Sequence, residues 1–141
     1  TIYNQSVLLK NVNDNLDFLI ELYDRLRYLN IESHYLFHCV PIKGMYHHRT
    51  SVEKGLLLIK QLTSRGLFSG RSKPMFTLMT DIGKITLYEN TIQQKKDNYI
   101  LLKSEYLYSE RIKWNKNWKL PSSAIINQDG TMSVWYLDGK D

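Results

Sequence analysis

The sequence predicts an α/β protein in which a βαβαβ unit, over residues 1–84, precedes a smaller antiparallel β extension, over residues 85–141. In the first region strand-like runs alternate with two long amphipathic periods, which is typical of parallel strands joined by helical crossovers. In the second region the β-type runs are short, and no long helical period separates them. Because a parallel sheet needs both faces covered, two helices over three strands indicate part of a larger α/β barrel or open sheet.

The first strand is expected in the run NQSVLL, and the first helix over about residues 15–29, where apolar side chains recur at helical spacing. Asn13 or Asp14 precedes this helix and can accept the free amide protons of its first turn. Asn30 is placed to end the helix.

The second strand is expected in ESHYLFHCV, whose composition is aromatic and apolar. Thr50 and Glu53 have the spacing of a capping box, which predicts the start of a second helix that runs to about Ser64. Gly66 is placed to end it. The third strand is expected in MFTLMT, after Pro74.

In the extension, short β-type runs are expected in NYILLKSEYLYS, RIKWN, SSAII and MSVWYLDG. Asp129 and Gly130 lie between the last two runs and predict a hairpin turn with a slightly lengthened loop.

The densest basic stretch is RIKWNKNWK, in which Trp114 and Trp118 alternate with lysines. Stacking aromatics among cations is what single-stranded nucleic acid needs, so a standalone basic module that binds it is one hypothesis. The alternative, which we favour, is a surface segment whose indole rings pack inward while the lysine amines stay in water. A nucleic acid partner is therefore not expected.

The chain has 141 residues, a formal net charge of +5 spread along its length, and one cysteine, Cys39. A single cysteine excludes an internal disulfide and fits a reducing, cytoplasmic location. No window approaches the roughly 18 apolar residues of a membrane span, and nothing resembles a signal peptide, so no membrane association is expected.

Three strand ends are candidates for chemistry, because ligands of parallel α/β sheets gather at the carboxyl ends of the strands. They are the turn after Leu9, the end of the second strand at His38 with the loop through Arg49, and the segment TDIGK. Lys84, which ends that segment, could form a Schiff base if it is buried, and a plain turn is the alternative. The histidines lack the spacing of metal ligands, so no metal site is expected.

Four stretches are distinctive: NQSVLLKNVND, YLFHC, KGMYHHRTSVEKGLLLIKQL, and GK ahead of YILLK. Together they resemble the carboxyl-terminal part of the lysine 2,3-aminomutase family of radical S-adenosylmethionine enzymes. The resemblance runs from Tyr3 to about Leu102 and is poor beyond Arg111. It implies a partial barrel of the radical-enzyme (TIM-like) type and three cofactors: S-adenosylmethionine, pyridoxal phosphate and a [4Fe-4S] cluster.

The resemblance also implies that the chain is a carboxyl-terminal fragment of a longer enzyme. In the family the CxxxCxxC loop that holds the cluster lies in the earlier part, whereas this sequence contains only Cys39. Since each cluster iron bound by protein needs its own thiolate, the chain cannot build the cluster, and we expect it to be inactive alone. As part of a barrel with unpaired strand edges, it is expected to form a homo-oligomer.

Single residues gain roles from the same resemblance. Gln5 matches a glutamine that contacts S-adenosylmethionine, and Lys84 matches the lysine that forms the internal aldimine with pyridoxal phosphate. His47, Arg49 and Thr50 match the loop over the cofactor mouth, and His38 is expected at the rim of the same pocket. The implied chemistry is hydrogen abstraction by a 5'-deoxyadenosyl radical, followed by migration of an imine-bound amino group of a small amino acid.

The sequence departs from the lysine enzymes at two charged positions. Val40 stands where those enzymes carry an aspartate that holds the distal amine of the substrate, and a valine cannot pair with a buried ammonium. Asp81 is the candidate for a second such aspartate, with Met79 as the alternative occupant of its position. We therefore expect a substrate other than free lysine, and a related enzyme that makes β-lysine on elongation factor P is a further option. Asn15 stands at a zinc-cysteine position of the family, so assembly through zinc is not expected.

Overall fold

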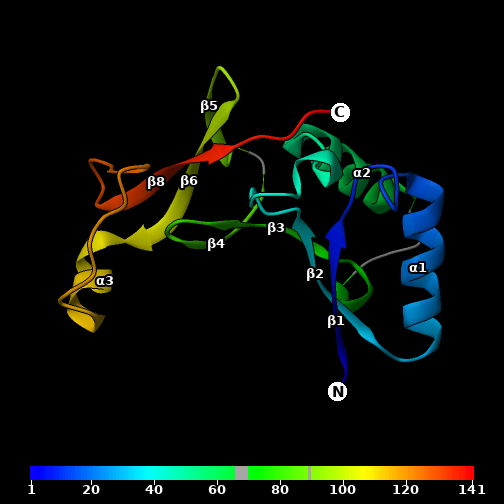
Figure 1. Ribbon diagram of the computed structural model, residues 1–141. Helices are drawn as coiled ribbons and strands as arrows, with labels where there is room; N and C mark the ends of the chain where they lie inside the picture. The colour runs from blue at the N-terminus through cyan, green and yellow to red at the C-terminus, as the bar shows by residue number, and fades with distance from the viewer. Residues whose placement is uncertain (66–69, 89) are drawn as a thin grey trace. The chain divides into compact units, whose positions relative to one another are not determined.

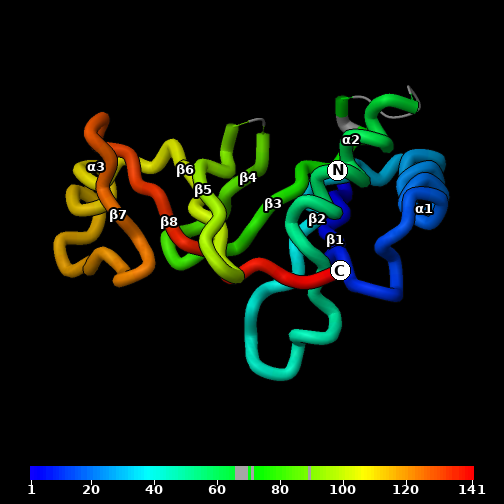
Figure 2. The backbone as a smooth tube through the Cα atoms, turned by 90° about the horizontal axis from the view of Figure 1, so that it is seen from above, coloured from blue at the N-terminus to red at the C-terminus, as the bar shows by residue number. Residues whose placement is uncertain are grey.

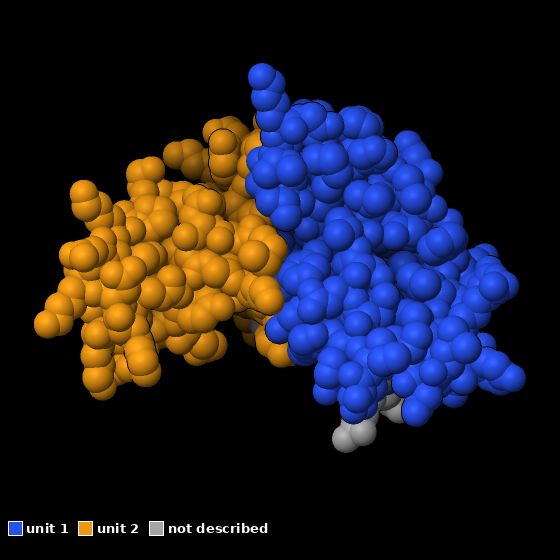
Figure 3. Space-filling view, turned by 60° about the horizontal axis from the view of Figure 1, so that its bottom comes forward, with its two compact units in different colours: residues 1–78, 139–141 blue, residues 79–138 orange. Residues whose placement is uncertain are grey.

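The computed structural model describes residues 1–65, 70–88 and 90–141. It is a mixed α/β structure, as predicted, with α-helices and two β-sheets. The chain divides into two compact units, which are coloured separately in Figure 3. The first comprises Thr1–Leu78 together with Gly139–Asp141, and the second comprises Met79–Asp138.

The first unit alternates strands and helices along the chain (Figure 1). β1 pairs with β2 and β2 pairs with β3, all in parallel, so the predicted parallel βαβαβ order is confirmed. The hydrogen-bonded order of the strands of this unit is β1-β2-β3. The elements are β1 (Tyr3–Leu8), α1 (Leu16–Tyr28), β2 (Glu32–His38), the 3-10 helix η1 (Tyr46–His48), α2 (Val52–Ser64), the 3-10 helix η2 (Gly70–Ser72) and β3 (Met75–Thr80).

Leucine side chains dominate the core of the first unit, where α1 packs against β2 and α2. Full burial of one such side chain contributes about 1.5–3 kcal/mol to folding. Gly55 of α2 allows a close approach to β3, because a Cβ there would lie 2.2 Å from Cζ of Phe76. The fully buried apolar residues of this unit include Leu8, Leu19, Tyr23, Leu36, Leu62 and Leu78.

The cap of α1 differs from the prediction. Asn15 is the N-cap, and its side chain accepts from the N–H of Phe18 at 2.8 Å. Asn13 and Asp14 were the wrong candidates, because both are used in the preceding turn. Asn13 accepts there from the N–H of Leu9 at 2.7 Å, and Asp14 accepts from another backbone N–H at 2.9 Å.

The start of α2 agrees with the prediction but its capping does not. Ser51 is the N-cap, and its hydroxyl accepts from the N–H of Lys54 at 3.1 Å. The predicted capping box of Thr50 and Glu53 is therefore wrong by one residue, because Thr50 is fully buried and its carbonyl faces His38 instead.

Of the two predicted helix ends, the structure describes one. Asn30 follows the C-cap of α1 with φ 57°, the left-handed conformation that ends helices, so this prediction is confirmed. Gly66, the predicted end of α2, lies outside the described residues. Figure 2 shows the backbone trace with both ends of the chain marked. The last residues, Gly139–Asp141, belong to the first unit.

The second unit is built on an antiparallel sheet with the order β5-β6-β8-β7, which confirms the predicted antiparallel extension. The predicted hairpin between β7 and β8 is also confirmed: Gly130 has φ 84°, and Asp129 accepts from the N–H and the hydroxyl of Thr131 at 3.0 and 2.6 Å. The elements of this unit are β4 (Gly83–Thr86), β5 (Ile92–Lys96), β6 (Tyr99–Leu107), α3 (Tyr108–Trp114), β7 (Ala124–Ile126) and β8 (Thr131–Leu137).

Three elements of the second unit, β4, β5 and α3, were not predicted. The run RIKWN, expected to be β-type, lies mostly in α3, which is only 7 residues long. Fewer than two turns of helix are too short to show a helical period, which explains the error. Lys84 was expected just past a strand, but it lies inside β4, because the chain reverses at Asp81 and Ile82.

Candidate functional site

Two buried polar side chains tie the end of β2 to the segment that precedes α2. His38 has no exposed surface, and its Nε2 lies 2.8 Å from the carbonyl oxygen of Thr50, which assigns the proton to Nε2. Arg49 is 1% exposed, and its Nε donates to the carbonyl oxygen of Cys39 at 2.8 Å. Because buried polar groups are costly unless they are bonded, these bonds fix both ends of the β2–α2 connection.

Cys39 lies in this cluster and is buried. Burial raises the pKa of its thiol, and the Arg49 charge offsets only part of that effect. The thiol therefore stays protonated near neutral pH, whereas a metal ligand would have to be a thiolate. Within the three described ranges, no group of three or more His, Cys, Asp or Glu could hold a metal ion.

The C-terminal residues contact the same segment. A Cβ on Gly139 would lie 2.0 Å from the carbonyl oxygen of Thr50, so only glycine fits there. The two carboxylate oxygens of Asp141 accept from the backbone N–H and the hydroxyl of Ser51, at 2.8 and 2.6 Å. A carboxylate is favourable at this point because it faces the N-terminus of α2.

Gln5 and His47 are the exposed members of the predicted site in the first unit. Gln5 lies on β1 and His47 lies in η1, so a ligand can reach the amide and the imidazole. The structure thus brings His38 and Arg49 together in a buried cluster and leaves the other two candidates exposed. The cofactor-binding roles of all four residues stay predictions.

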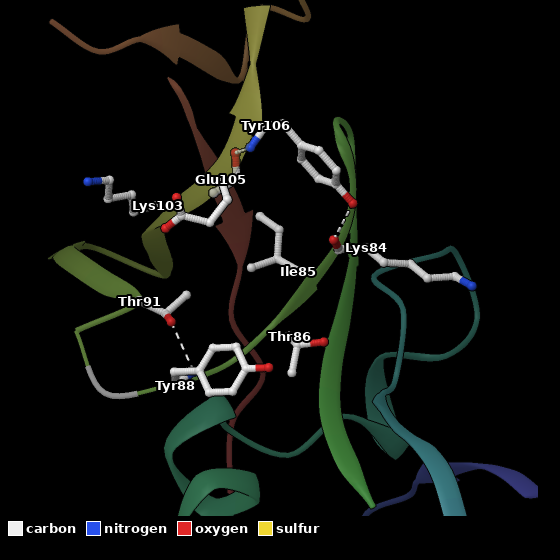
Figure 4. A pocket seen from close by; sticks show the side chains of 9 residues that line it. Lys84, Ile85, Thr86, Tyr88, Thr91, Lys103, Glu105 and Tyr106 are labelled. Atoms are coloured by element: carbon white, nitrogen blue, oxygen red, sulfur yellow. Dashed lines mark hydrogen bonds between the residues drawn. The ribbon is translucent and has the colours of Figure 1, made fainter. Parts of the chain in front are cut away.

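Asp81 and Lys84 belong to the second unit, at the turn between β3 and β4. Lys84 is exposed, whereas the next residue of β4, Ile85, is buried on the opposite face. A hollow of about 250 Å³ lies beside β4, and Lys84, Ile85 and Tyr106 are among its lining residues. In Figure 4 the amine end of the Lys84 side chain points away from the other labelled side chains.

Three residues that the sequence analysis missed contact this turn. Tyr106, Arg111 and Ser123 each form a hydrogen bond with one of residues 81–84. The partners are separated by 22 to 42 positions in the chain. No local spacing or motif could have revealed them, because the contacts depend on the fold of the second unit.

The Trp and Lys segment does not present a pair of stacking rings. Trp114 is 85% exposed. The ring of Trp118, by contrast, is covered by Arg111, whose Cζ lies 4.9 Å from the ring centroid. Binding of single strands relies on successive bases that stack on aromatic rings, so a single exposed indole gives this hypothesis no support. None of the described helices is long and apolar enough to span a bilayer.

Comparison with other proteins gives a consistent set of relatives. A search against models of protein families finds no match. A protein of Aquifex aeolicus that carries the provisional name of an L-lysine 2,3-aminomutase is 39% identical over 99 residues, which is 69% of this chain. The L-lysine 2,3-aminomutase of Clostridium subterminale is 36% identical over 117 residues, 79% of this chain. The glutamate 2,3-aminomutase of Clostridioides difficile is 29% identical over 103 residues, 72% of this chain.

The fold and the candidate residues define an α/β protein with a parallel βαβαβ unit and an exposed lysine on the strand that follows it. With these relatives, the chain belongs to the lysine 2,3-aminomutase family. It spans about a quarter of the length of the curated relatives it matches, 26% and 28% for the first two.

Proposed function

We propose that this chain is the carboxyl-terminal part of a radical S-adenosylmethionine, pyridoxal-phosphate-dependent amino acid 2,3-aminomutase. The observation that carries the proposal is the similarity to lysine and glutamate 2,3-aminomutases over 72% to 79% of the chain. The parallel β1-β2-β3 unit with its two crossover helices supports it, since it has the form of a segment of an α/β barrel.

The residues of this chain fit two of the three cofactors. Lys84 has an exposed primary amine, the group that a pyridoxal phosphate carbonyl requires, and Gln5 offers an exposed amide to S-adenosylmethionine. When bound, pyridoxal phosphate supplies a conjugated system that stabilises a substrate radical. The [4Fe-4S] cluster does not fit, because the single cysteine is buried and its raised pKa keeps the thiol protonated. The ligands of the cluster must therefore lie outside this chain, and we expect the chain alone to be inactive.

In this proposal the residues of the first unit hold the loop over the cofactor mouth. His38 and Arg49 bond the carbonyl groups of Thr50 and Cys39, so they orient the loop while they stay buried. His47 lies on the same loop with its imidazole exposed, where it can contact a bound cofactor.

The proposed substrate is a small amino acid other than free lysine. Val40, two residues after the end of β2, carries no charge to pair with a distal ammonium. Asp81 is the proposed substrate-binding carboxylate; it is exposed and accepts one hydrogen bond, from Ser123 at 2.6 Å.

The test uses the longer protein, including the residues upstream of Thr1, supplied with S-adenosylmethionine, pyridoxal phosphate and a one-electron reductant. We expect β-amino acid formation from a member of a panel of small amino acids other than lysine, detected by NMR, slower turnover of free lysine, and no product from residues 1–141 alone. The Lys84→Ala variant should lose activity, while the exposed Lys60→Ala variant should keep it. Equal or faster turnover of lysine would contradict the substrate proposal, and full activity of Lys84→Ala would contradict the role of the lysine.

We also propose that the protein forms a homo-oligomer in the cytoplasm. β1 is an edge strand in the described sheet, and its side chains at Tyr3 and Val7 are 58% and 40% exposed. An unpaired edge with apolar side chains favours association. Light scattering tests this proposal, and a strictly monomeric species would contradict it.

A further inference from the structure

The turn of residues 81–84 is bonded to the rest of the second unit along its length. Each donor comes from β6 or from the segment that follows it, and two of the three acceptors are backbone carbonyls. Backbone groups bonded in this way fix the direction in which the neighbouring side chains leave the chain. The bonds run from Ser123 Oγ to Asp81 Oδ2 at 2.6 Å, from Arg111 Nη2 to the Ile82 carbonyl at 2.8 Å, and from Tyr106 Oη to the Lys84 carbonyl at 2.6 Å.

Gly83 completes the contact with β6. Its φ of +125° is a conformation that residues with a Cβ rarely adopt, and a Cβ there would lie 3.2 Å from the hydroxyl of Tyr106. Its carbonyl oxygen also accepts from the hydroxyl of Thr80 at 2.7 Å. The tyrosine ring therefore lies against the backbone immediately before Lys84, and its hydroxyl bonds the backbone at Lys84 itself.

Arg111 is itself fixed by two aromatic rings. Its Cζ lies 5.1 Å from the ring centroid of Tyr106 and 4.9 Å from that of Trp118. Cation–π contacts of this kind hold a guanidinium in place in addition to its hydrogen bond. Two of the three residues that bond the turn, Tyr106 and Arg111, thus also support each other.

We propose that Tyr106 and Arg111 are positioning residues for Lys84: they fix the Ile82 and Lys84 carbonyls so that the exposed amine leaves β4 at one point and in one direction. A flexible lysine on a fixed backbone meets a carbonyl ligand more often in a productive geometry than the same lysine on a loose turn. This inference rests on the proposed role of Lys84 as the pyridoxal phosphate lysine. Neither residue is proposed to contact the substrate or the cofactor.

The test compares Tyr106→Phe and Arg111→Gln with a control, Tyr108→Phe. Tyr106→Phe removes only the hydroxyl, so the fold should persist. Tyr108→Phe makes the same change on α3, where the Tyr108 ring lies near that of Trp118. The first measurement is hydrogen exchange of the amides of residues 82–84. Loss of one hydrogen bond should speed their exchange about threefold to tenfold in the two variants and leave the control unchanged.

The second measurement is covalent trapping on the whole chain. Each protein is mixed with pyridoxal phosphate, reduced with borohydride, and digested, and the adduct at Lys84 is compared with that at Lys96, an exposed lysine on β5 of the same unit. Condensation of the amine with the aldehyde releases water, and borohydride delivers a hydride that reduces the resulting C=N bond to a stable secondary amine. We expect the wild type to favour Lys84, and Tyr106→Phe and Arg111→Gln to lose about threefold to tenfold of that preference. Arg111→Lys, which keeps a cation between the rings, should restore part of it.

The outcomes separate the two proposals. If the wild type traps Lys84 no better than Lys96, the role of Lys84 in the proposed function fails, and the positioning role fails with it. If the wild type favours Lys84 and the variants keep the same preference, the positioning inference alone is overturned. A loss of preference together with faster exchange in the turn supports both.

Discussion

In the first unit the candidate residues His38 and Arg49 are buried and bond through their own side chains, whereas in the second unit Lys84 is exposed and its carbonyl receives the bond. The polar side chains of the first unit are needed to satisfy a buried loop, since unbonded polar groups there would be costly. In the second unit, hydrogen bonds hold the backbone carbonyls of Ile82 and Lys84, and the amine of Lys84 stays accessible.

This difference shows two ways to prepare a site. A buried side chain that bonds a neighbouring loop shapes the site without being available to a ligand, while a fixed backbone with an exposed side chain presents a reactive group. Substitution of the buried polar residues should therefore alter the loop of the first unit. Substitution of the residues that bond the turn should alter the direction of the Lys84 side chain in the second.

Truncation of buried core side chains should give the largest losses of stability, and should do so in both units. Leu36→Ala in the first unit and Leu102→Ala in the second remove fully buried side chains, and each should lower the free energy of unfolding by about 2–5 kcal/mol. All three tryptophans lie in the second unit, so their fluorescence reports that unit, while hydrogen exchange of β2 amides reports the first.

Leu57→Ala is the control for both variants, because this side chain is 54% exposed on α2. It should change stability by less than about 0.5 kcal/mol. If either core variant cost as little as this control, that unit would lack the packed core described above.

The docking of the C-terminal residues should depend on Gly139. Gly139→Ala introduces a methyl group 2.0 Å from the Thr50 carbonyl, so the tail or the loop must shift, at a cost of about 1–3 kcal/mol. Urea unfolding followed by far-UV circular dichroism measures this loss. Lys140→Ala changes only the exposed neighbour and should be close to neutral; a neutral Gly139→Ala would mean that the tail is not docked.

Capping of α2 should depend on Ser51 and not on the capping box that the sequence suggested. Ser51→Ala removes the hydroxyl that accepts from Lys54 and should cost about 1 kcal/mol. Glu53→Ala, at an exposed position, should stay within about 0.5 kcal/mol of the wild type. The reverse order of the two unfolding free energies, measured by urea titration, would restore the capping box.

In each unit, an ionised aspartate should stabilise the fold at pH values above its ordinary pKa. Burial acts to raise the pKa of Asp141, but hydrogen bonds from Ser51 and the charges of Lys54 and Lys10 outweigh it, so the folded pKa is lowered. The hydrogen bonds from Thr131 lower the pKa of Asp129 in the second unit. Because both pKa values are depressed on folding, their stabilising contributions are fully present above the ordinary value near pH 4 and are lost as the pH falls through the folded value.

Unfolding midpoints between pH 7 and pH 2.5 measure this effect. Asp141→Asn and Asp129→Asn should be less stable than the wild type near pH 6, and the difference should shrink toward zero at the acid end. A difference that is constant over the whole range would show that ionisation of these carboxylates has no part in it.

Much of the first unit could be predicted because its signals are local. The alternation of apolar runs identifies β1, β2, β3 and both long helices, and the strand–helix–strand order implies that the strands are parallel. The exposed position of Gln5 and the burial of Arg49 could not be predicted, because burial depends on which other segments cover a residue. The capping errors have the same origin. Asn13 and Thr50 are suitable caps by residue type, but Asn13 accepts a hydrogen bond in the preceding turn and Thr50 is buried one residue before the helix cap.

The sequence alone established the α/β class, the alternation of parallel strands with helices, the antiparallel extension with its hairpin, and the family, since each depends on residue spacing or on runs of identical residues. Only the tertiary structure decided that Lys84 lies within a strand and that Tyr106 and Arg111 hold its turn. It also decided that the last residues dock on Ser51. These contacts join residues 22 to 90 positions apart, and whether such distant groups meet is set by how the whole chain packs.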